Sequence, residues 1–309
     1  PQPLPRLEVD EPVLRMTFGV NTSPLSGKDG RFVTSRQIKE RLDREVLGNV
    51  SIRLGATSSP EVIEVAGRGE LQLAVLIESM RREGFELQVS RPEVIIREIS
   101  GRPHEPLERA VVDVPNDHVG TVTQAVAPRK GQVTDLRPGD AGRTIVTLTA
   151  PARGLLGFRS LLMTATRGTA LIHQHHAGWM PWAGELPHRQ GGAMIADRLG
   201  TSTGFALDNL QKRGELFIGP NTDVYEGMII GEASRPEDMQ VNATKTKQLT
   251  NIRTHSTDEA IKLKPPREMT LELAIEWIAE DELVEVTPNA IRVRKRYLTE
   301  SERKRQKRR

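Results

Sequence analysis

The chain has 309 residues, of which 37% are hydrophobic and 28% are charged, and its formal net charge is +3 at neutral pH. This length exceeds that of one ordinary compact domain and predicts two or three, while the composition excludes a disordered chain. The absence of cysteine excludes a disulfide framework, a thiolate nucleophile and a cysteine-ligated zinc, and no apolar run reaches the roughly 18 residues of a membrane span.

The first residues of the chain predict a linker. Residues 1–11, PQPLPRLEVDE, are rich in proline and contain neither the basic start nor the apolar stretch of a signal peptide. They also lack an initiator methionine. We therefore expect an interdomain linker here, in a natural protein that begins further upstream.

Residues 12–91 predict a first ferredoxin-like domain. Thr34 and Gln37 have the spacing of a capping box, so a helix is expected to begin there. A second helix is expected to begin near Glu70 and to end at Gly84. Strands are expected at residues 13–20, 51–56, 61–67 and 85–90. The resulting order, βαββαβ, is the split arrangement of ferredoxin-like folds.

Residues 92–176 repeat a similar order of elements. Strands are expected at residues 94–100, 107–115, 132–136, 144–149 and 170–173, and helices at residues 119–127 and 155–166. The repeat is one of element order and not of residue identity. It predicts a second ferredoxin-like domain.

Residues 177–309 differ from the preceding residues in their pattern of elements and predict an irregular C-terminal domain. Short strands alternate with glycine-containing turns, and the clearest helix is expected at residues 269–282, after the helix-breaking Pro265-Pro266. A strand at residues 291–298 then leads into the charged terminus. The predicted fold class is α+β, with two ferredoxin-like (βαββαβ) domains followed by this irregular α+β domain.

The positive charge of the chain is concentrated at its C-terminal end. From Arg292 to Arg309, ten Lys or Arg stand against two Glu, which gives a local charge of +8 and leaves the remainder near −5. Such a run attracts phosphate-rich polymers by counterion release. A solvated tail is the alternative interpretation.

The sequence contains no phosphate-binding loop of the G-x-x-x-x-G-K-[ST] type. After Gly27-Lys28, Asp29 stands where Ser or Thr is required, and Thr22 stands where the first glycine should be. There is also no G-x-S-x-G elbow of a serine hydrolase. We therefore predict no catalytic residue and no cofactor in this chain.

Three neighbouring histidines raise the possibility of a metal site. His173, His175 and His176 lie close together, and a strand would place the first two on one face, as two zinc ligands could be. The candidates for a third ligand are His188, Glu185 and Asp197. No H-E-x-x-H or other recognised metal spacing is present. We therefore predict no metal site and interpret the histidines as a polar or phosphate-contacting surface, with a metalloenzyme as the alternative.

Nucleic-acid binding has the best physical support. Residues 242–253, NATKTKQLTNIR, place basic side chains among small polar ones, which suits phosphates and the edges of unpaired bases. The strand expected at residues 291–298 adds a second basic surface. The predicted RNA-binding residues are Lys245, Lys247, Gln248, Asn251, Arg253, Arg292, Arg294, Lys295 and Arg296. An ordinary polar hairpin is the alternative for the first segment.

Several long motifs resemble those of one protein family. The runs NTSPLSGKDGRFVTSRQI (Asn21–Ile38) and GRGELQLAVLIESMRREGFELQVSRPEVI (Gly67–Ile95) are similar to domain III of the BipA, or TypA, family of translational GTPases. ARGLLGFRSLLMT (Ala152–Thr164) resembles domain V of that family. Three further runs resemble the C-terminal domain that is particular to this family: GFALDNLQKRGELFIGPNTDVYEGMIIGE, VNATKTKQLTNIR and DELVEVTPNAIRVRKRYLTE.

The resemblance implies a function as well as a fold. Full-length members carry a G domain and a β-barrel domain with no counterpart in this sequence, so GTP and Mg²⁺ are implied for the parent protein and no GTPase activity for this chain. The implied partner is the ribosome, where a family member spans both subunits. The implied contacts are with large-subunit rRNA and with the acceptor end of A-site tRNA. The loop with Lys245, Lys247, Gln248 and Arg253 is the implied contact.

The family's implied roles are large-subunit assembly and stress-adapted translation. We expect a monomer in the bacterial cytoplasm, or in a plastid if the source is a plant, and no membrane partner. A general RNA-binding module that does not need the ribosome is the alternative function.

Overall fold

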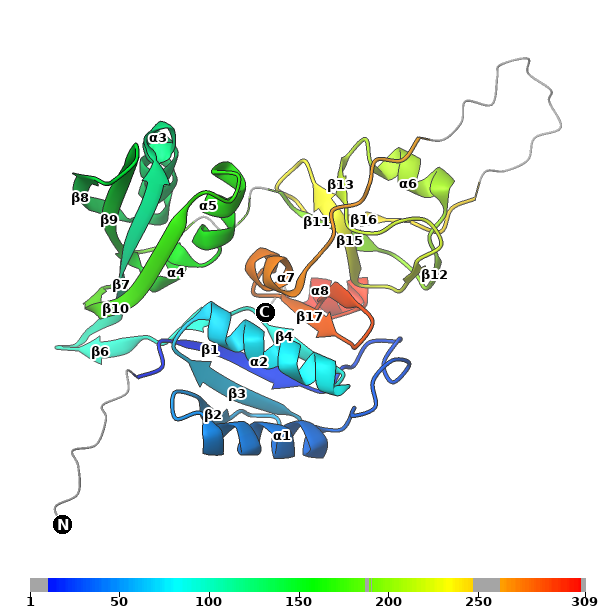
Figure 1. The fold of residues 1–309 in the computed structure, drawn as a ribbon. Helices are drawn as coiled ribbons and strands as arrows, with labels where there is room; N and C mark the ends of the chain where they lie inside the picture. Colours follow the sequence, from blue (N-terminus) through cyan, green and yellow to red (C-terminus); the bar gives the residue numbers. More distant parts are fainter. Residues whose placement is uncertain (1–10, 187–188, 190, 247–261, 307–309) are drawn as a thin grey trace, which may run out of the picture. The chain divides into compact units, whose positions relative to one another are not determined.

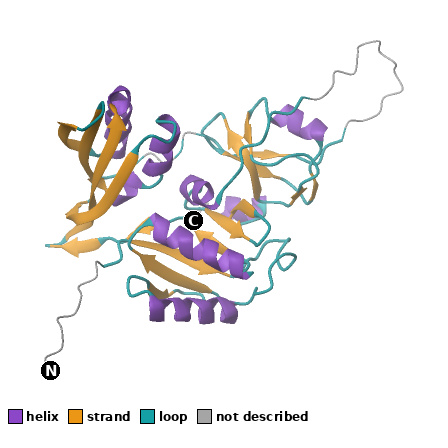
Figure 2. Ribbon diagram, in the orientation of Figure 1, coloured by secondary structure: helices purple, strands orange, loops and turns teal. Residues whose placement is uncertain are grey.

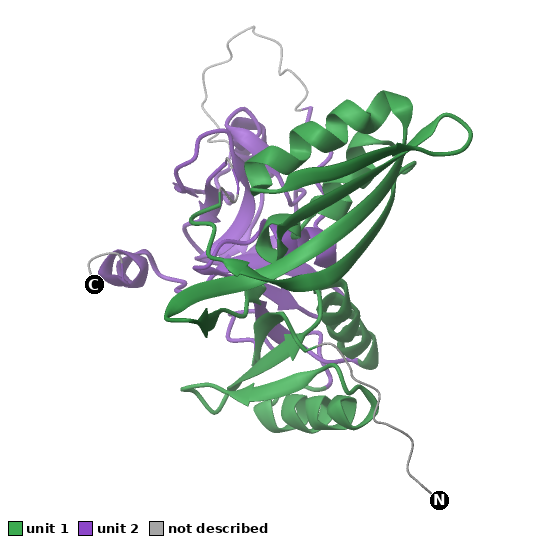
Figure 3. Cartoon of the chain, turned by 90° about the vertical axis from the view of Figure 1, so that its left-hand side faces the viewer, with its two compact units in different colours: residues 1–20, 32–83, 91–188 green, residues 21–31, 84–90, 189–309 purple. Residues whose placement is uncertain are grey.

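The computed structural model describes residues 11–186, 189, 191–246 and 262–306. The chain divides into two compact units, which Figure 3 shows in separate colours. The first unit takes residues 1–20, 32–83 and 91–188, and the second takes residues 21–31, 84–90 and 189–309. Two short pieces of the first predicted domain therefore belong to the unit that contains the C-terminal part of the chain.

The first elements follow the βαββαβ order that the sequence predicts (Figure 1). They are β1 (Leu14–Gly19), α1 (Ser35–Gly48), β2 (Arg53–Ala56), β3 (Val62–Gly67), α2 (Glu70–Glu83) and β4 (Leu87–Ser90). Within the first unit, β3 pairs antiparallel with both β1 and β2, and Leu14 of β1 lies opposite Gly67 of β3.

Local signals define the ends of the two long helices. The predicted capping box of α1 is confirmed, because the Thr34 side chain accepts from the backbone of Gln37 and the Gln37 side chain accepts from the backbone of Thr34. The predicted end of α2 is also confirmed. Gly84 follows this helix with φ +97°, a backbone conformation that glycine adopts without steric cost.

The next elements of the first unit form a second sheet with helices. They are β6 (Arg97–Ile99), β7 (Arg102–Pro115), α3 (Val119–Val126), β8 (Gln132–Pro138), β9 (Arg143–Pro151), α4 (Ala152–Leu155), α5 (Phe158–Ala165) and β10 (Leu171–Pro181). The preceding short strand β5 (Glu93–Val94) pairs with β1 instead. The strand order is β10-β7-β9-β8, and all neighbours are antiparallel. β10 continues across the domain boundary predicted at residue 176.

One face of this sheet carries the core. The even-numbered residues Ala110, Val112 and Val114 of β7 are buried in a cluster with Val122 of α3 and Phe158 of α5. Because side chains alternate along a strand, the odd-numbered residues of β7 lie on the other face.

The second unit is a mixed α+β arrangement (Figure 2). Its further elements are β11 (Ala193–Ala196), β12 (Gly200–Thr201), α6 (Gly204–Leu210), β13 (Gly214–Leu216), β14 (Asp223–Val224), β15 (Met228–Ala233), β16 (Met239–Val241), α7 (Leu271–Trp277), β17 (Glu282–Val286), β18 (Ile291–Lys295) and α8 (Glu300–Gln306). Within this unit the sheet runs β16-β11-β15-β18-β17-β4, and β13 also pairs with β15. Its core includes Met194, Leu207, Tyr225 and Ile230.

The fold class is α+β, as predicted, but one helix is shorter than expected. The helix predicted at residues 269–282 spans Leu271–Trp277, with Thr270 as its N-cap. Ile278 leaves the helix in an extended conformation and is fully buried, and the chain continues into β17 at Glu282. Among the described residues, no helix combines the length and the apolar character of a membrane span.

Candidate nucleic-acid interface

The start of the segment predicted to bind RNA is fixed at the N-terminal end of α6. Thr203 is the N-cap of this helix, and its side chain accepts from the Ala206 N–H. The Thr203 hydroxyl donates to the backbone carbonyl of Lys245 at 2.5 Å, and the Thr203 N–H donates to the carbonyl of Ala243 at 3.0 Å. The backbone is therefore held at Lys245, whose side chain remains exposed.

The far side of the segment is fixed at the C-terminal end of the same helix. The side-chain amide of Gln211, the C-cap residue, donates to the Lys262 carbonyl at 3.0 Å and accepts from the Lys264 N–H at 2.9 Å. Both lysines are exposed. We name this arrangement the α6 base, made of Thr203, Gln211, Lys245, Lys262 and Lys264.

The α6 base presents positive charge from a fixed backbone. Its three lysines lie at the two ends of one helix, and Lys212, which follows the C-cap residue, is engaged with Asp208 at 3.2 Å. The remaining residues predicted for this loop lie outside the described residues: Lys247, Gln248, Asn251 and Arg253. Of the residues predicted for this loop, the structure therefore describes Lys245, while Lys262 and Lys264 on the far side of residues 247–261 were not predicted.

The second predicted basic surface, along residues 291–298, requires a correction. β18 lies between β15 and β17 in the sheet, and Arg294 is only 1% exposed. The Arg294 guanidinium donates to Thr22 Oγ1 at 2.8 Å and also to the side-chain oxygen of Gln88. A strand with partners on both edges and buried faces cannot present this cation to RNA.

Lys295 is also buried, at 2% exposure, and the prediction that it is a surface residue is wrong. Its ammonium group forms ion pairs with Asp238 at 2.7 Å, Asp281 at 2.9 Å and Glu282 at 2.9 Å. Burial lowers the pKa of Lys295, but the charge of Glu282 and the hydrogen bonds to these carboxylates outweigh it and raise the pKa above its usual value. Lys295 is therefore a charged structural residue.

Arg292 and Arg296 differ in their surroundings. The side chain of Arg292 is 19% exposed and pairs with Glu285 at 2.9 Å and with Asp29 at 3.7 Å. Arg296 is exposed, and its guanidinium donates to the Glu280 carbonyl at 3.1 Å. Of the four cations predicted on this strand, Arg296 is the one with an exposed side chain.

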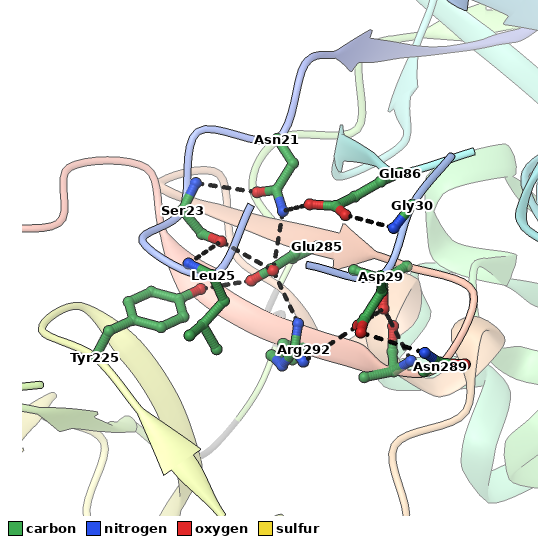
Figure 4. A network of polar contacts seen from close by, with 12 residues as sticks. Asn21, Ser23, Leu25, Asp29, Gly30, Glu86, Tyr225, Glu285, Asn289 and Arg292 are labelled. Atoms are coloured by element: carbon green, nitrogen blue, oxygen red, sulfur yellow. Dashed lines mark hydrogen bonds and ion pairs between the residues drawn. The ribbon is translucent and has the colours of Figure 1, made fainter. Parts of the chain in front are cut away.

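Glu285 is the buried carboxylate that engages Arg292 (Figure 4). Its buried carboxylate accepts hydrogen bonds from Asn21 at 2.9 Å, Ser23 at 2.9 Å, Tyr225 at 2.7 Å and Arg292 at 2.9 Å. Burial, followed by the negative charge of Glu285, raises the pKa of the Tyr225 hydroxyl well above its usual value. Four donors on one carboxylate provide the compensation that a buried charge needs.

A second carboxylate, Glu86, organises the loop at residues 21–31. Glu86 is fully buried and accepts from Asn21 at 2.8 Å and from the backbone N–H groups of Gly27 and Gly30 at 2.9 and 3.0 Å. A Cβ atom added at Gly30 would lie 2.4 Å from the Glu86 Cβ, so the approach requires glycine. The amides of this glycine-rich loop thus bind an internal carboxylate.

Asp29 completes this network from the same loop. Burial raises its pKa, but hydrogen bonds from Thr287 at 2.9 Å and Asn289 at 3.2 Å, together with Arg292, lower the pKa below its usual value. These contacts join the loop to β17, to β18 and to the turn between them. They make the loop part of the scaffold that carries the α6 base.

The histidines predicted as a polar surface lie on β10. His173 and His175 are exposed, and His175 lies opposite Arg109 of β7. His176 is half-buried, and its ring meets Trp179 edge-on at 5.8 Å between centroids. Among the described residues, which do not include His188, there is no group of three or more His, Cys, Asp or Glu that could hold a metal ion.

The buried carboxylates were missed by reasoning from the sequence. Glu282 falls within the helix predicted at residues 269–282, but it is the first residue of β17, fully buried and bound by Arg189 through two hydrogen bonds of 2.6 and 2.7 Å. A local signal was available, because Glu282 and Glu285 stand among Leu283, Val284 and Val286 in a short apolar run that is typical of a buried strand.

Two protein-family models and several curated relatives match this chain. Residues 191–300 match the TypA/BipA C-terminal domain, and residues 102–190 match the elongation factor G C-terminus. A curated relative from Escherichia coli K12, named large ribosomal subunit assembly factor BipA, is 52% identical over 305 residues, which cover 98% of this chain and 50% of the relative. Relatives with the same name from Synechocystis and Haemophilus influenzae are 49% and 50% identical, over 96% and 98% of this chain and 49% of each relative.

The chain spans about half the length of these curated relatives. A solved structure from Thermus thermophilus aligns with a TM-score of 0.38 at 12% identity, covering 58% of this chain and 42% of that one.

Proposed function

Because this chain belongs to the TypA/BipA family and corresponds to the C-terminal half of its members, we propose that it supplies ribosomal RNA contacts to a factor that assembles the large ribosomal subunit. The observation that carries the proposal is the α6 base. Exposed Lys245 at one end of α6 and exposed Lys262 and Lys264 at the other flank a segment that adds Lys247 and Arg253 in its sequence. The name of the relatives supports the assembly role.

The chemistry of the α6 base suits structured RNA. Lysines that contact phosphates release condensed counterions, and such contacts position a protein without reading sequence. The backbone that carries the lysines is fixed by Thr203 and Gln211, so little ordering is needed before binding. Gln248 and Asn251 in the same segment would add hydrogen bonds to base edges.

The proposed partners are large-subunit rRNA, the acceptor end of A-site tRNA and, in the full-length protein, both ribosomal subunits in the cytosol. We assign no catalytic role to this chain. GTP and Mg²⁺ would act in the G domain of a full-length family member and control whether these RNA contacts are made. The proposal for this chain is therefore a non-catalytic binding function.

Co-sedimentation with 50S ribosomal subunits at low salt tests the proposal. We expect the chain to pellet with the subunits, and we expect the triple variant Lys245→Ala, Lys262→Ala, Lys264→Ala to bind at least about tenfold more weakly, since each lost phosphate contact weakens binding. The matched control replaces exposed Arg36, Lys39 and Arg44 of α1 and changes the net charge equally. Equal binding by both variants would contradict the α6 base as the contact.

An unrelated RNA hairpin separates this function from that of a general RNA-binding module. The proposal predicts markedly tighter binding to the 50S subunit than to the hairpin at the same salt concentration. Equal affinity for the two would favour the general module.

A further inference from the structure

The sheet β10-β7-β9-β8 has a face opposite its helices. Ala110, Val112 and Val114 are buried with residues of α3 and α5, so the odd-numbered residues of β7 lie on the opposite face. Arg109 on that face is exposed. We call this side of the sheet, the side of Arg109, the open face.

Four polar residues form a row across the open face. In the strand register, His175 of β10 lies opposite Arg109 of β7, Arg109 lies opposite Thr149 of β9, and Thr149 lies opposite Gln132 of β8. Directly opposite residues of antiparallel strands place their side chains on the same face, about 5 Å apart. His173, two residues before His175, lies on this face as well and is also exposed.

The charge of the open face is positive because its carboxylates are engaged by other cations. Asp113 pairs with Arg143 at 2.7 Å, and Asp135 pairs with Arg137 at 2.5 Å. Arg109 adds a further positive charge beside His175. This setting does not suit a metal ion, because a cation in register with His175 repels it.

We propose that the open face binds unpaired RNA bases, as a second RNA site separate from the α6 base. The flat rings of His173 and His175 stack on bases, the Arg109 guanidinium stacks or contacts phosphate, and Thr149 and Gln132 supply hydrogen bonds to base edges. The inference shares with the proposed function only the choice of RNA as partner, and it does not depend on the lysines of the α6 base.

The architecture of the sheet agrees with this assignment. RNA recognition motifs bind two or three bases on the exposed face of a four-stranded sheet, through rings that project from its strands. Here β10, β7, β9 and β8 form the main path of a five-stranded sheet, with β6 also paired to β7, and the sheet has helices on one face and flat side chains on the exposed one. The likeness is one of sheet architecture, and the row of side chains determines the site.

Fluorescence anisotropy with a labelled 12-nucleotide single-stranded RNA, and with the same strand in a duplex, tests the assignment on the whole chain. We expect the triple variant Arg109→Ala, His173→Ala, His175→Ala to bind the single strand at least about tenfold more weakly, given the usual contribution of base stacking. Binding to the duplex should change little, because its bases are already stacked on one another.

Two further variants make the result specific. His173→Phe with His175→Phe keeps flat rings and should retain single-strand binding. The matched control on the helix side of the same sheet, Gln124→Ala, Arg159→Ala, Thr164→Ala, removes one arginine and two polar side chains from exposed positions and should bind as the parent chain does.

Three results would overturn the assignment: unchanged single-strand binding by the alanine variant, loss of binding on addition of EDTA, or no single-strand binding by a parent chain that still pellets with 50S subunits. The last result would leave the proposed function standing. Loss of 50S binding by the lysine variant alone, with single-strand binding intact, would support both sites.

Discussion

The lysines of the α6 base and the cations of β18 belong to the same unit and carry the same charge, but their environments are opposite. Lys245 is exposed on a fixed backbone, whereas Lys295 is 2% exposed and contacts three carboxylates. The first arrangement leaves a cation available to an external anion, and the second uses it to neutralise internal ones. A basic segment is therefore an RNA-binding candidate only when its counter-charges lie outside the protein.

The largest expected difference between the two regions is in stability. Lys295→Ala leaves Asp238 and fully buried Glu282 without one of their cations, so we expect the free energy of unfolding to fall by about 3–5 kcal/mol. Lys245→Ala removes an exposed side chain and should change it by less than about 0.5 kcal/mol. Urea denaturation of both variants measures this, and equal stabilities would remove the distinction.

Glu108 of β7 differs from the buried carboxylates around Lys295, because burial is the only cause of its pKa shift. The pKa of its carboxyl rises from 4.5 to about 7. The folded chain therefore holds a proton that the unfolded chain releases between these pH values. The stability contributed by Glu108 is complete below pH about 4.5 and is lost as the pH rises through about 7, by up to roughly 3 kcal/mol.

Unfolding free energies of the parent chain and of Glu108→Gln, measured from pH 5 to pH 8, check this. We expect the variant to lack the fall in stability attributed to Glu108. Superimposable pH profiles would show that Glu108 titrates normally.

A smaller effect is expected at the hydroxyl that supports the buried network. Tyr225→Phe removes the 2.7 Å hydrogen bond to Glu285, which keeps its three other donors, so we expect a loss of about 1–2 kcal/mol in the free energy of unfolding. Tyr297 is 38% exposed, and Tyr297→Phe is a matched control that should have no measurable effect. Thermal denaturation of both variants would detect a difference, and identical transitions would contradict the role given to Tyr225.

Much of the fold could be predicted because its signals are local. The cap of Thr34 with Gln37 and the glycine that ends α2 are readable within a few residues. The end of α7 was not readable, because Ile278 leaves the helix to fill the core while the sequence continues its helical spacing. The membership of residues 21–31 in the second unit was also not readable, since it depends on a carboxylate more than 260 residues away in sequence.

The predicted RNA-binding residues also divide into those with local signals and those whose surroundings depend on distant residues. Lys245 is surrounded in sequence by small polar residues, so its exposure followed from composition. Arg294 and Lys295 belong to a run of basic residues that is typical of an exposed strand, and only the spatial positions of Gln88 and Asp238 show that both are enclosed. Partners that are distant in sequence decide whether a basic residue binds RNA or stabilises the protein.

The salt dependence of 50S binding tests the central claim most directly, because it counts phosphate contacts. For the parent chain, the logarithm of the association constant should fall linearly with the logarithm of the salt concentration. Replacing Lys245, Lys262 and Lys264 together should make that slope shallower by about 2 to 3. A slope identical to that of the parent chain would contradict RNA binding by the exposed lysines of the α6 base.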